Sequence, residues 1–107
     1  MRIAIPIETK QKSGIVSKKF ARSNFFALVD KELKSYELIE NPFKDLSMGV
    51  GKKLLNLLVK EHQIDALLAF ELGLKVHLMA TEAAMQLIII SEKRQTLKQL
   101  LSYLQVE

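Results

Sequence analysis

The sequence predicts a single α/β domain over residues 1–107, built on a five-stranded mixed sheet with helices on both faces. A length of 107 residues fits one domain. In the second half, apolar runs of strand length alternate with helical patterns, which is typical of parallel strands joined by helices. In the first half, two strand-like runs flank a link of only three residues, which indicates an antiparallel hairpin. The expected order is β-β-β-α-β-α-β-α.

The first half of the chain supplies three of the expected strands. Residues 2–7 form the first, because isoleucine alternates there with smaller residues. Pro6 fits near the end of this strand, since it has no N–H to donate to a neighbour. The polar residues 8–22 form a long loop, and long loops in compact domains are often functional. Residues 24–30 and 34–40 form the hairpin, which an Asn-Pro pair ends.

A leucine-rich helix of about 12 residues is expected after the stretch 47–51, with Ser47 or Asp45 as its cap. Residues 64–70 then form a continuous apolar run, which is typical of a strand buried on both faces. A right-handed crossover is expected between consecutive parallel strands.

The remaining elements follow the same alternation. Gly73 opens a second helix that extends to about Met85, and residues 87–90 form a fully apolar fifth strand. Ser91 is expected to cap a last helix. The apolar stripe of that helix consists of Leu97, Leu100, Leu101 and Leu104.

The composition excludes several classes of protein. The chain has no cysteine, so it holds no disulfide, no thiolate zinc site and no complete ligand set for an iron–sulfur cluster. Its start is too short and too soon charged for a signal peptide, and no apolar run approaches the roughly 18 residues of a membrane span. We therefore expect a cytoplasmic protein with no membrane partner. The net charge of +4 favours anionic partners only modestly.

The first candidate site is the loop-to-helix junction that contains Gly49, Gly51, Lys52 and Lys53. A helix N-terminus presents free N–H groups and partial positive charge, and glycine lets a ligand approach the backbone. The helix dipole disfavours positive charge in the first turn, where Lys52 and Lys53 lie. An anion bound there would attract both lysines instead. The alternative is that both glycines shape a tight turn and both lysines point into water. The spacing is not that of a P-loop.

The second candidate site is the basic stretch Ser17-Lys18-Lys19-Phe20-Ala21-Arg22. It leads into the second strand, and we expect it to meet the Gly49–Lys53 junction at one edge of the sheet. Clefts at strand ends are where open α/β sheets bind ligands. The alternative is that Phe20 fills the core and the charges form a solvated rim.

Neither histidines nor carboxylates suggest catalysis. His62 suits the C-terminal end of its helix, and His77 stands alone in the next helix. Asp65 begins its strand and Glu71 ends it, so nearly 20 Å would separate these carboxylates, at about 3.3 Å per residue. No arrangement of nucleophile and base stands out, and we expect neither an enzyme nor a metal site.

Several short motifs, taken together in this order, resemble one family. They are Ile3-Ala4-Ile5-Pro6, Val16-Ser17, Phe20-Ala21-Arg22-Ser23, Phe26-Ala27-Leu28-Val29-Asp30, Glu40-Asn41-Pro42, Gly49-Val50-Gly51, Ile64-Asp65-Ala66-Leu67 and Leu72-Gly73. Over roughly residues 1–90 the chain resembles the dinitrogenase iron–molybdenum cofactor biosynthesis family, of the NifX and NafY type.

This resemblance implies a ribonuclease H-like fold without nuclease activity. It also implies a role in nitrogen fixation, as a nitrogenase accessory factor that carries the iron–molybdenum cofactor or its iron–sulfur precursor. The cluster would be cargo, and nitrogenase-assembly proteins would be the partners. The residues that we predict to bind this anionic cluster or another small anion are Ser17, Lys18, Lys19, Phe20, Arg22, Gly49, Gly51 and Lys52.

The sequence departs from the family pattern at the basic loop. The family usually has His-Phe-Gly-Arg there, where this chain has Lys19-Phe20-Ala21-Arg22. Lysine pairs with anions as a point charge, so the sequence favours charge pairing over metal coordination. The family glycine near the end of the second helix is Ala84, and its Gly-Pro opening is Gly73-Leu74.

A second hypothesis is a small regulatory or interaction domain that binds a protein or a nucleic acid. It rests on the same basic loop, which Phe20 and Phe25 flank. Nucleic acid is the less expected partner, because the lysines and arginines are spread along the chain.

Overall fold

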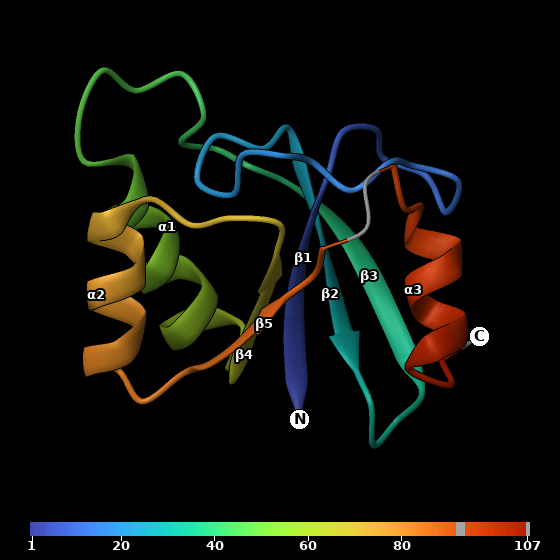
Figure 1. Cartoon of the computed structure of the whole chain (residues 1–107). Coiled ribbons are helices and arrows are strands. Elements are labelled where there is room, and N and C mark those ends of the chain that lie inside the picture. Colours follow the sequence, from blue (N-terminus) through green and yellow to red (C-terminus); the bar gives the residue numbers. More distant parts are fainter. Residues whose placement is uncertain (92–93, 107) are drawn as a thin grey trace.

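A computed structural model describes residues 1–91 and 94–106 of the chain. Five strands and three α-helices follow one another along these residues, and a π-helical turn extends the first helix (Figure 1). They are β1 (Arg2–Ile7), β2 (Phe25–Asp30), β3 (Ser35–Glu40), α1 (Val50–Asn56), η1 (Leu57–Glu61), β4 (Ala66–Ala69), α2 (Leu74–Glu82), β5 (Gln86–Ile89) and α3 (Leu97–Tyr103).

The strands form one mixed sheet in the order β3-β2-β1-β4-β5. β1 lies at its centre, antiparallel to β2 and parallel to β4. β2 and β3 pair antiparallel over their whole length, from Phe25↔Glu40 to Asp30↔Ser35. The predicted hairpin and the five-stranded mixed sheet are therefore confirmed.

Pro6 lies near the end of β1, as the sequence predicts. β4 pairs with β1 only at Ile3 and Ala4, so β4 needs no N–H from Pro6. Beyond that point the chain folds back on itself, and the Ser17 N–H donates to the Pro6 carbonyl at 2.9 Å. The long loop after β1 thus continues the sheet where β4 ends.

Helices cover both faces of the sheet, as predicted (Figure 1). On one face, α1 and α2 pack over buried residues that include Leu28, Leu54 and Leu67. On the other face, α3 packs through Leu97, Leu100 and Leu101. Alternation along β1 explains the division, because Ala4 joins the first cluster while Ile3, Ile5 and Ile7 join the second.

Two predicted helix caps are wrong. Gly49 precedes α1 with φ +73° and no side-chain cap, so neither Ser47 nor Asp45 serves there. α3 begins at Leu97 behind Thr96, whose hydroxyl accepts a hydrogen bond from the Gln99 N–H. The Gln99 side chain accepts in return from the Thr96 N–H at 2.8 Å, which completes a capping box. Thr96 forms an isolated antiparallel bridge with Ile15 and the helix starts directly after it, so Ser91 lies too early to cap this helix.

β5 is an edge strand. Its apolar sequence predicts burial, yet Ile89 is 57% exposed because no described strand lies outside it. Within residues 1–91 and 94–106, no helix has the length and apolar character of a membrane span.

Candidate functional site at the carboxyl ends of the parallel strands

Three loops gather at the carboxyl ends of β1, β4 and β5 (Figure 1). The loop after β1 leads to β2 on one side, while the chain after β4 leads through α2 to β5 on the other side. Open α/β sheets bind ligands in the crevice where the connections diverge in this way. The topology therefore points to the space between the ends of β1 and β4.

Backbone hydrogen bonds fix the wall of this space. Residues 15–17 fold back beside β1, because the Glu8 N–H donates to the Ile15 carbonyl at 2.9 Å. On their other side, the Val16 N–H donates to the Gln95 carbonyl at 2.8 Å. The segment 15–17 is thus held between the central strand and the chain that enters α3.

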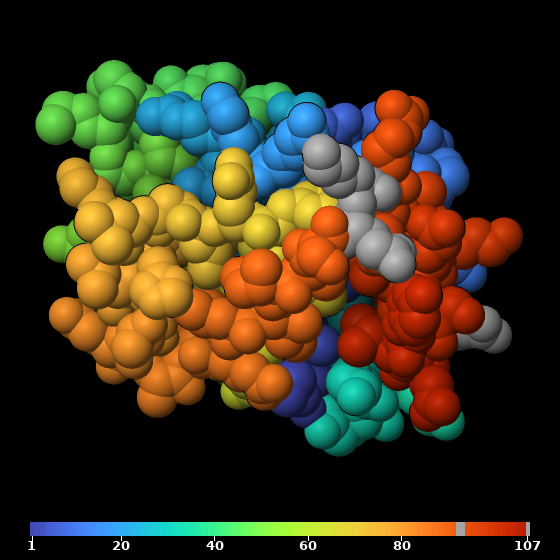
Figure 2. All heavy atoms as spheres, viewed as in Figure 1, coloured from blue at the N-terminus to red at the C-terminus, as the bar shows by residue number. Residues whose placement is uncertain are grey.

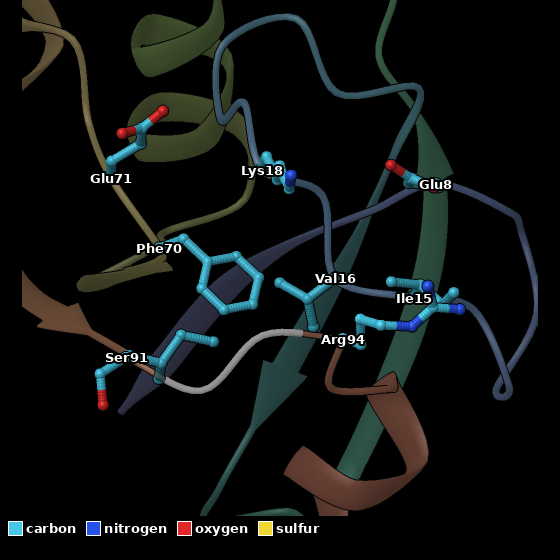
Figure 3. A pocket seen from close by; sticks show the side chains of 9 residues that line it. Glu8, Ile15, Val16, Lys18, Phe70, Glu71, Ser91 and Arg94 are labelled. Atoms are coloured by element: carbon cyan, nitrogen blue, oxygen red, sulfur yellow. The ribbon is translucent and has the colours of Figure 1, made fainter.

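A hollow of about 870 Å³ opens here. This volume lies within the range of small-molecule pockets. The lining residues are Glu8, Ile15, Val16, Lys18, Phe70, Glu71, Ile90, Ser91 and Arg94. Figure 3 shows the Phe70 ring and the Val16 side chain pointing toward one another across it. The hollow therefore has an apolar floor and a polar rim.

The rim carries the cations Lys18 and Arg94 and the carboxylates of Glu8 and Glu71. In Figure 3 the Glu71 carboxylate points away from the Phe70 ring. No carboxylate of residues 1–91 or 94–106 forms an ion pair with Lys18 or Arg94. Both cations are exposed, so they can meet an anionic ligand at little desolvation cost.

Of the predicted binding residues, only Lys18 lines the hollow. Lys19 is exposed on the same loop. Ser17 is buried, and its Oγ lies 2.8 Å from the Ser23 Oγ. Phe20 is only 3% exposed and packs edge-to-face on Phe26, with 5.1 Å between ring centroids. Ser17 and Phe20 thus anchor the loop, while its lysines point outward.

Arg22 joins the two predicted sites. Its guanidinium donates to the carbonyls of Lys44 and Leu46, at 2.8 and 2.9 Å. The loop 17–22 therefore lies against the segment that leads to Gly49, and Figure 2 shows the two side by side at one end of the molecule. The Arg22 guanidinium donates to both carbonyls, so Arg22 connects the loop 17–22 to the segment before Gly49.

The glycine junction lies outside the lining of the hollow. Gly49 adopts φ +73°, a conformation that glycine accepts readily. At Gly51, an added Cβ would stand 2.8 Å from Val76 Cγ2, so this glycine lets α1 approach α2. Lys52 and Lys53 are exposed. Anion binding at this junction stays a prediction.

The histidines lie away from the hollow. His62 Nδ1 is 3.8 Å from Glu37 Oε1, and His77 is exposed on α2. No cluster of three or more histidine, aspartate or glutamate side chains suited to a metal occurs in the described part of the chain.

Sequence reasoning missed most of the lining. The lining residues that were not predicted to bind a ligand are Glu8, Ile15, Val16, Phe70, Glu71, Ile90, Ser91 and Arg94. Glu8, Phe70 and Ile90 each directly follow a strand, and Glu71 and Ser91 come one residue later. The carboxyl ends of neighbouring parallel strands meet at one edge of the sheet. That position in the chain was the available signal. No such sequence signal pointed to Arg94, because its position at the hollow depends on how the chain enters α3.

Comparison with known proteins identifies the family. A model of the family described as dinitrogenase iron-molybdenum cofactor matches residues 1–105. The chain belongs to this family. No curated protein matches the sequence.

Solved structures share the family fold. The apo form of the orange protein from Desulfovibrio gigas is 26% identical, with a TM-score of 0.81 over 94% of this chain and 83% of that one. A Thermotoga protein named as a candidate NifB is 27% identical, with a TM-score of 0.79 over 97% and 86% of the two chains. A Methanocaldococcus jannaschii protein named as a candidate dinitrogenase is 15% identical, with a TM-score of 0.61 over 98% and 88%, and shows the fold alone.

Proposed function

We propose that the chain is a non-catalytic carrier in the cytoplasm that binds an anionic iron–sulfur cluster, the iron–molybdenum cofactor or its precursor, as cargo. The observation that carries this proposal is the pair of cations, Lys18 and Arg94, at a hollow of about 870 Å³ in a chain of this family. The recipients of the cargo would be nitrogenase-assembly proteins.

The chemistry of the donors favours binding by charge and hydrogen bonds. Iron–sulfur clusters are usually held by cysteine thiolates, and this chain has no cysteine. Lys18 and Arg94 at the rim can pair with the anionic groups of a cluster, the exposed Lys19 adds positive charge on the same loop, and the Ser91 hydroxyl can donate a hydrogen bond. Such a site holds its cargo without replacing the ligands of the metal, which suits transfer to a recipient.

The two predicted segments have different roles in this proposal. Ser17, Phe20 and Arg22 hold the loop in place, while Lys18 and Lys19 supply charge. Gly49, Gly51 and Lys52 belong to the adjoining junction, outside the hollow. A bound cluster would contact them only if it were large enough to extend beyond the hollow. Binding variants can therefore separate the hollow from the junction.

The test is anaerobic mixing with isolated iron–molybdenum cofactor, followed by gel filtration and measurement of the molybdenum and iron that elute with the protein. We expect a coloured complex of one cofactor per chain. Lys18→Gln and Arg94→Gln should each weaken binding about tenfold, since a hydrogen bond to a charged group contributes about 1.5 kcal/mol.

The matched control is Lys31→Gln, an exposed lysine that follows β2 at the opposite end of the sheet. It should bind as the wild type does. A larger loss for Lys52→Gln than for Lys18→Gln would move the site to the glycine junction. Wild-type protein that elutes without metal would overturn the carrier role.

The second hypothesis is an interaction domain for protein or nucleic acid, and it relied on the two aromatic rings that flank the basic loop. The burial of these rings argues against it. Phe20 is buried against Phe26, and Phe25 is partly buried against the α3 face, so neither ring is free to stack on a base. Nucleic-acid binding predicts retention on a polyanion column with steep salt dependence. Elution at low salt, without a shift of any nucleic acid, would exclude that form of the hypothesis.

A further inference from the structure

Folding gathers lysines that are spread along the sequence at one end of the molecule. The registers Ile7↔Phe25 and Phe25↔Glu40 bring the loops 8–24 and 41–49 to the end of the sheet where β4 and β5 also finish. The helices α1, α2 and α3 all begin at this end (Figure 1). We call these loops and the first turns of these helices the basic end. Its exposed lysines include Lys12, Lys19, Lys52, Lys53, Lys75 and Lys98.

These lysines form no ion pair with any carboxylate in the part of the chain that the structure describes. At the opposite end of the sheet, charges of opposite sign meet. There the Met1 ammonium pairs with the Glu32 carboxylate, and Arg2 Nη1 lies 3.1 Å from Asp30 Oδ2. The fold therefore pairs charges at one end and leaves a positive surface at the other, which attracts an anionic partner.

This positive surface extends beyond the hollow. Lys18 and Arg94 line the hollow, and the other lysines of the basic end do not. Lys12 and Lys98 lie together on the α3 side, because the Lys98 N–H donates to the Lys12 carbonyl at 2.9 Å. Lys52 lies on the helix that covers the opposite face of the sheet. A small ligand confined to the hollow contacts neither group, so the whole surface fits a macromolecule.

Exposed apolar side chains at the same end indicate the class of macromolecule. Met48 is 81% exposed just before α1, and Leu74 is 74% exposed as the first residue of α2. The contact of Gly51 with Val76 holds the starts of these two helices together. Apolar contacts inside a polar rim are typical of protein–protein interfaces, in which methionine is enriched. These two side chains therefore favour a protein as the partner.

We infer that the basic end is a docking surface for an acidic face of a partner protein, with Met48 and Leu74 as its apolar contacts. The inference rests on the proposed carrier role, in which the partner is the recipient of the cargo. A partner docked here lies over the hollow. The carboxylates of Glu8, Asp45 and Glu71 lie among the lysines, where they repel a phosphate backbone and can pair with cations of a protein.

Titration of the full chain with three probes of equal negative charge tests this surface. They are a peptide of glutamates only, an acidic peptide that also carries leucines, and a single-stranded DNA. We expect the leucine-containing peptide to bind most tightly, with an affinity that falls as salt rises. Its amide NMR shifts should centre on residues 46–53 and 72–75. Failure of both peptides to bind, or tighter binding of the DNA, would overturn the inference.

A charge reversal locates the surface. The double variant Lys53→Glu with Lys75→Glu should weaken peptide binding at least about tenfold, because like charges then face each other. Acidic residues suit the start of a helix, so this variant should keep the circular dichroism of the wild type. The matched control is Lys31→Glu with Lys34→Glu, the same change of charge in the turn between β2 and β3. Equal losses for the two double variants would overturn the assignment.

The apolar contacts have a separate readout. Met48→Ser with Leu74→Ser should weaken the leucine-containing peptide about fivefold and leave the glutamate peptide unchanged. Unchanged binding of both peptides would exclude Met48 and Leu74 from the surface.

Docking and cargo binding fail in different experiments. The Lys53 and Lys75 double variant should still elute with iron and molybdenum after mixing with the cofactor, because neither residue lines the hollow. A chain that binds the peptide but elutes without metal would overturn the carrier role. A chain that retains metal but binds neither peptide would overturn the docking surface.

Discussion

Gly51 lies so close to Val76 that a Cβ atom at position 51 would stand 2.8 Å from Val76 Cγ2. Alanine normally stabilises a helix interior by about 1 kcal/mol relative to glycine. Here we expect Gly51→Ala to lower the free energy of unfolding by about 1–3 kcal/mol, because the added methyl group forces α1 away from α2. Urea unfolding measures this change.

A double-mutant cycle isolates the contact. In a Val76→Ala background the clash is gone, so Gly51→Ala should cost much less there than in the wild type. Equal costs in both backgrounds would show that the contact does not limit the packing of α1 on α2.

Asn41 is a buried tie between two loops. Its Nδ2 donates to the carbonyls of Ala21 and Ser23, at 2.8 and 2.9 Å, and its Oδ1 accepts from the Phe43 N–H at 3.0 Å. Asn41→Ala should lower the free energy of unfolding by about 2–3 kcal/mol, because buried polar groups lose their partners. Thermal and urea unfolding provide the measurement.

The control for Asn41 is Asn24→Ala. The Asn24 side chain is exposed and also donates to a backbone carbonyl, that of Glu8, at 3.2 Å. Water can replace that bond, so the cost should stay within about 0.5 kcal/mol. Similar losses of stability for the two variants would mean that burial does not increase the contribution of the Asn41 hydrogen bonds to the free energy of unfolding.

Asp30 makes stability depend on acid pH. The Leu33 N–H, which donates to Oδ1 at 3.0 Å, holds the pKa of Asp30 below its ordinary value of 3.8, and the Arg2 guanidinium lowers that pKa further, against the opposing effect of burial. As the pH falls, Asp30 of the unfolded chain is therefore protonated at a higher pH than Asp30 of the folded chain. The stabilisation is present above pH 3.8 and is lost as the pH falls through the lower folded-state value.

Asp30→Asn should therefore reduce stability near neutral pH and flatten its loss below about pH 4. Glu32, whose pKa the amino terminus lowers, still contributes in both proteins, so the difference between wild type and variant is the quantity to measure. Urea unfolding at several pH values gives it. Parallel curves for the two proteins would contradict the prediction.

Thr96 and Ser91 offer a direct test of the helix cap. Thr96→Ala should cost about 1 kcal/mol, because the hydroxyl satisfies the Gln99 N–H at the start of α3. Ser91→Ala should change stability by no more than about 0.5 kcal/mol. If urea midpoints show the larger loss for Ser91, then the helix begins earlier than residue 97.

The pattern of apolar residues was sufficient to predict the sheet. Alternation in residues 2–7 and the apolar run near residue 67 place β1 and β4 correctly, because burial of one or both faces imposes those patterns. The caps were harder. Ser91 and Thr96 are both good capping residues, and the choice depends on the distant Gly14 carbonyl, which accepts from the Leu97 N–H at 2.8 Å.

The candidate site shows the same limit. Glycine suits both close approach of a ligand and close approach of a helix. The neighbour at Val76 shows that Gly51 serves helix packing, and a ligand role for Gly51 stays a prediction. Lys18 could be predicted from the basic loop. Its placement beside Phe70 could not, because that depends on how the chain folds back at residues 15–17.

The wall of the hollow has a consequence for the timing of synthesis. The loop after β1 is clamped by the last part of the chain, where the N–H groups of Leu97 and Lys98 donate to the carbonyls of Gly14 and Lys12, at 2.8 and 2.9 Å. Until residues 97 and 98 have left the ribosome, this wall is held from the β1 side, where the Glu8 and Ser17 N–H groups donate to the Ile15 and Pro6 carbonyls, and its second side stays open. The closed wall that the proposed carrier role requires therefore forms only after residues 97 and 98 have been synthesised.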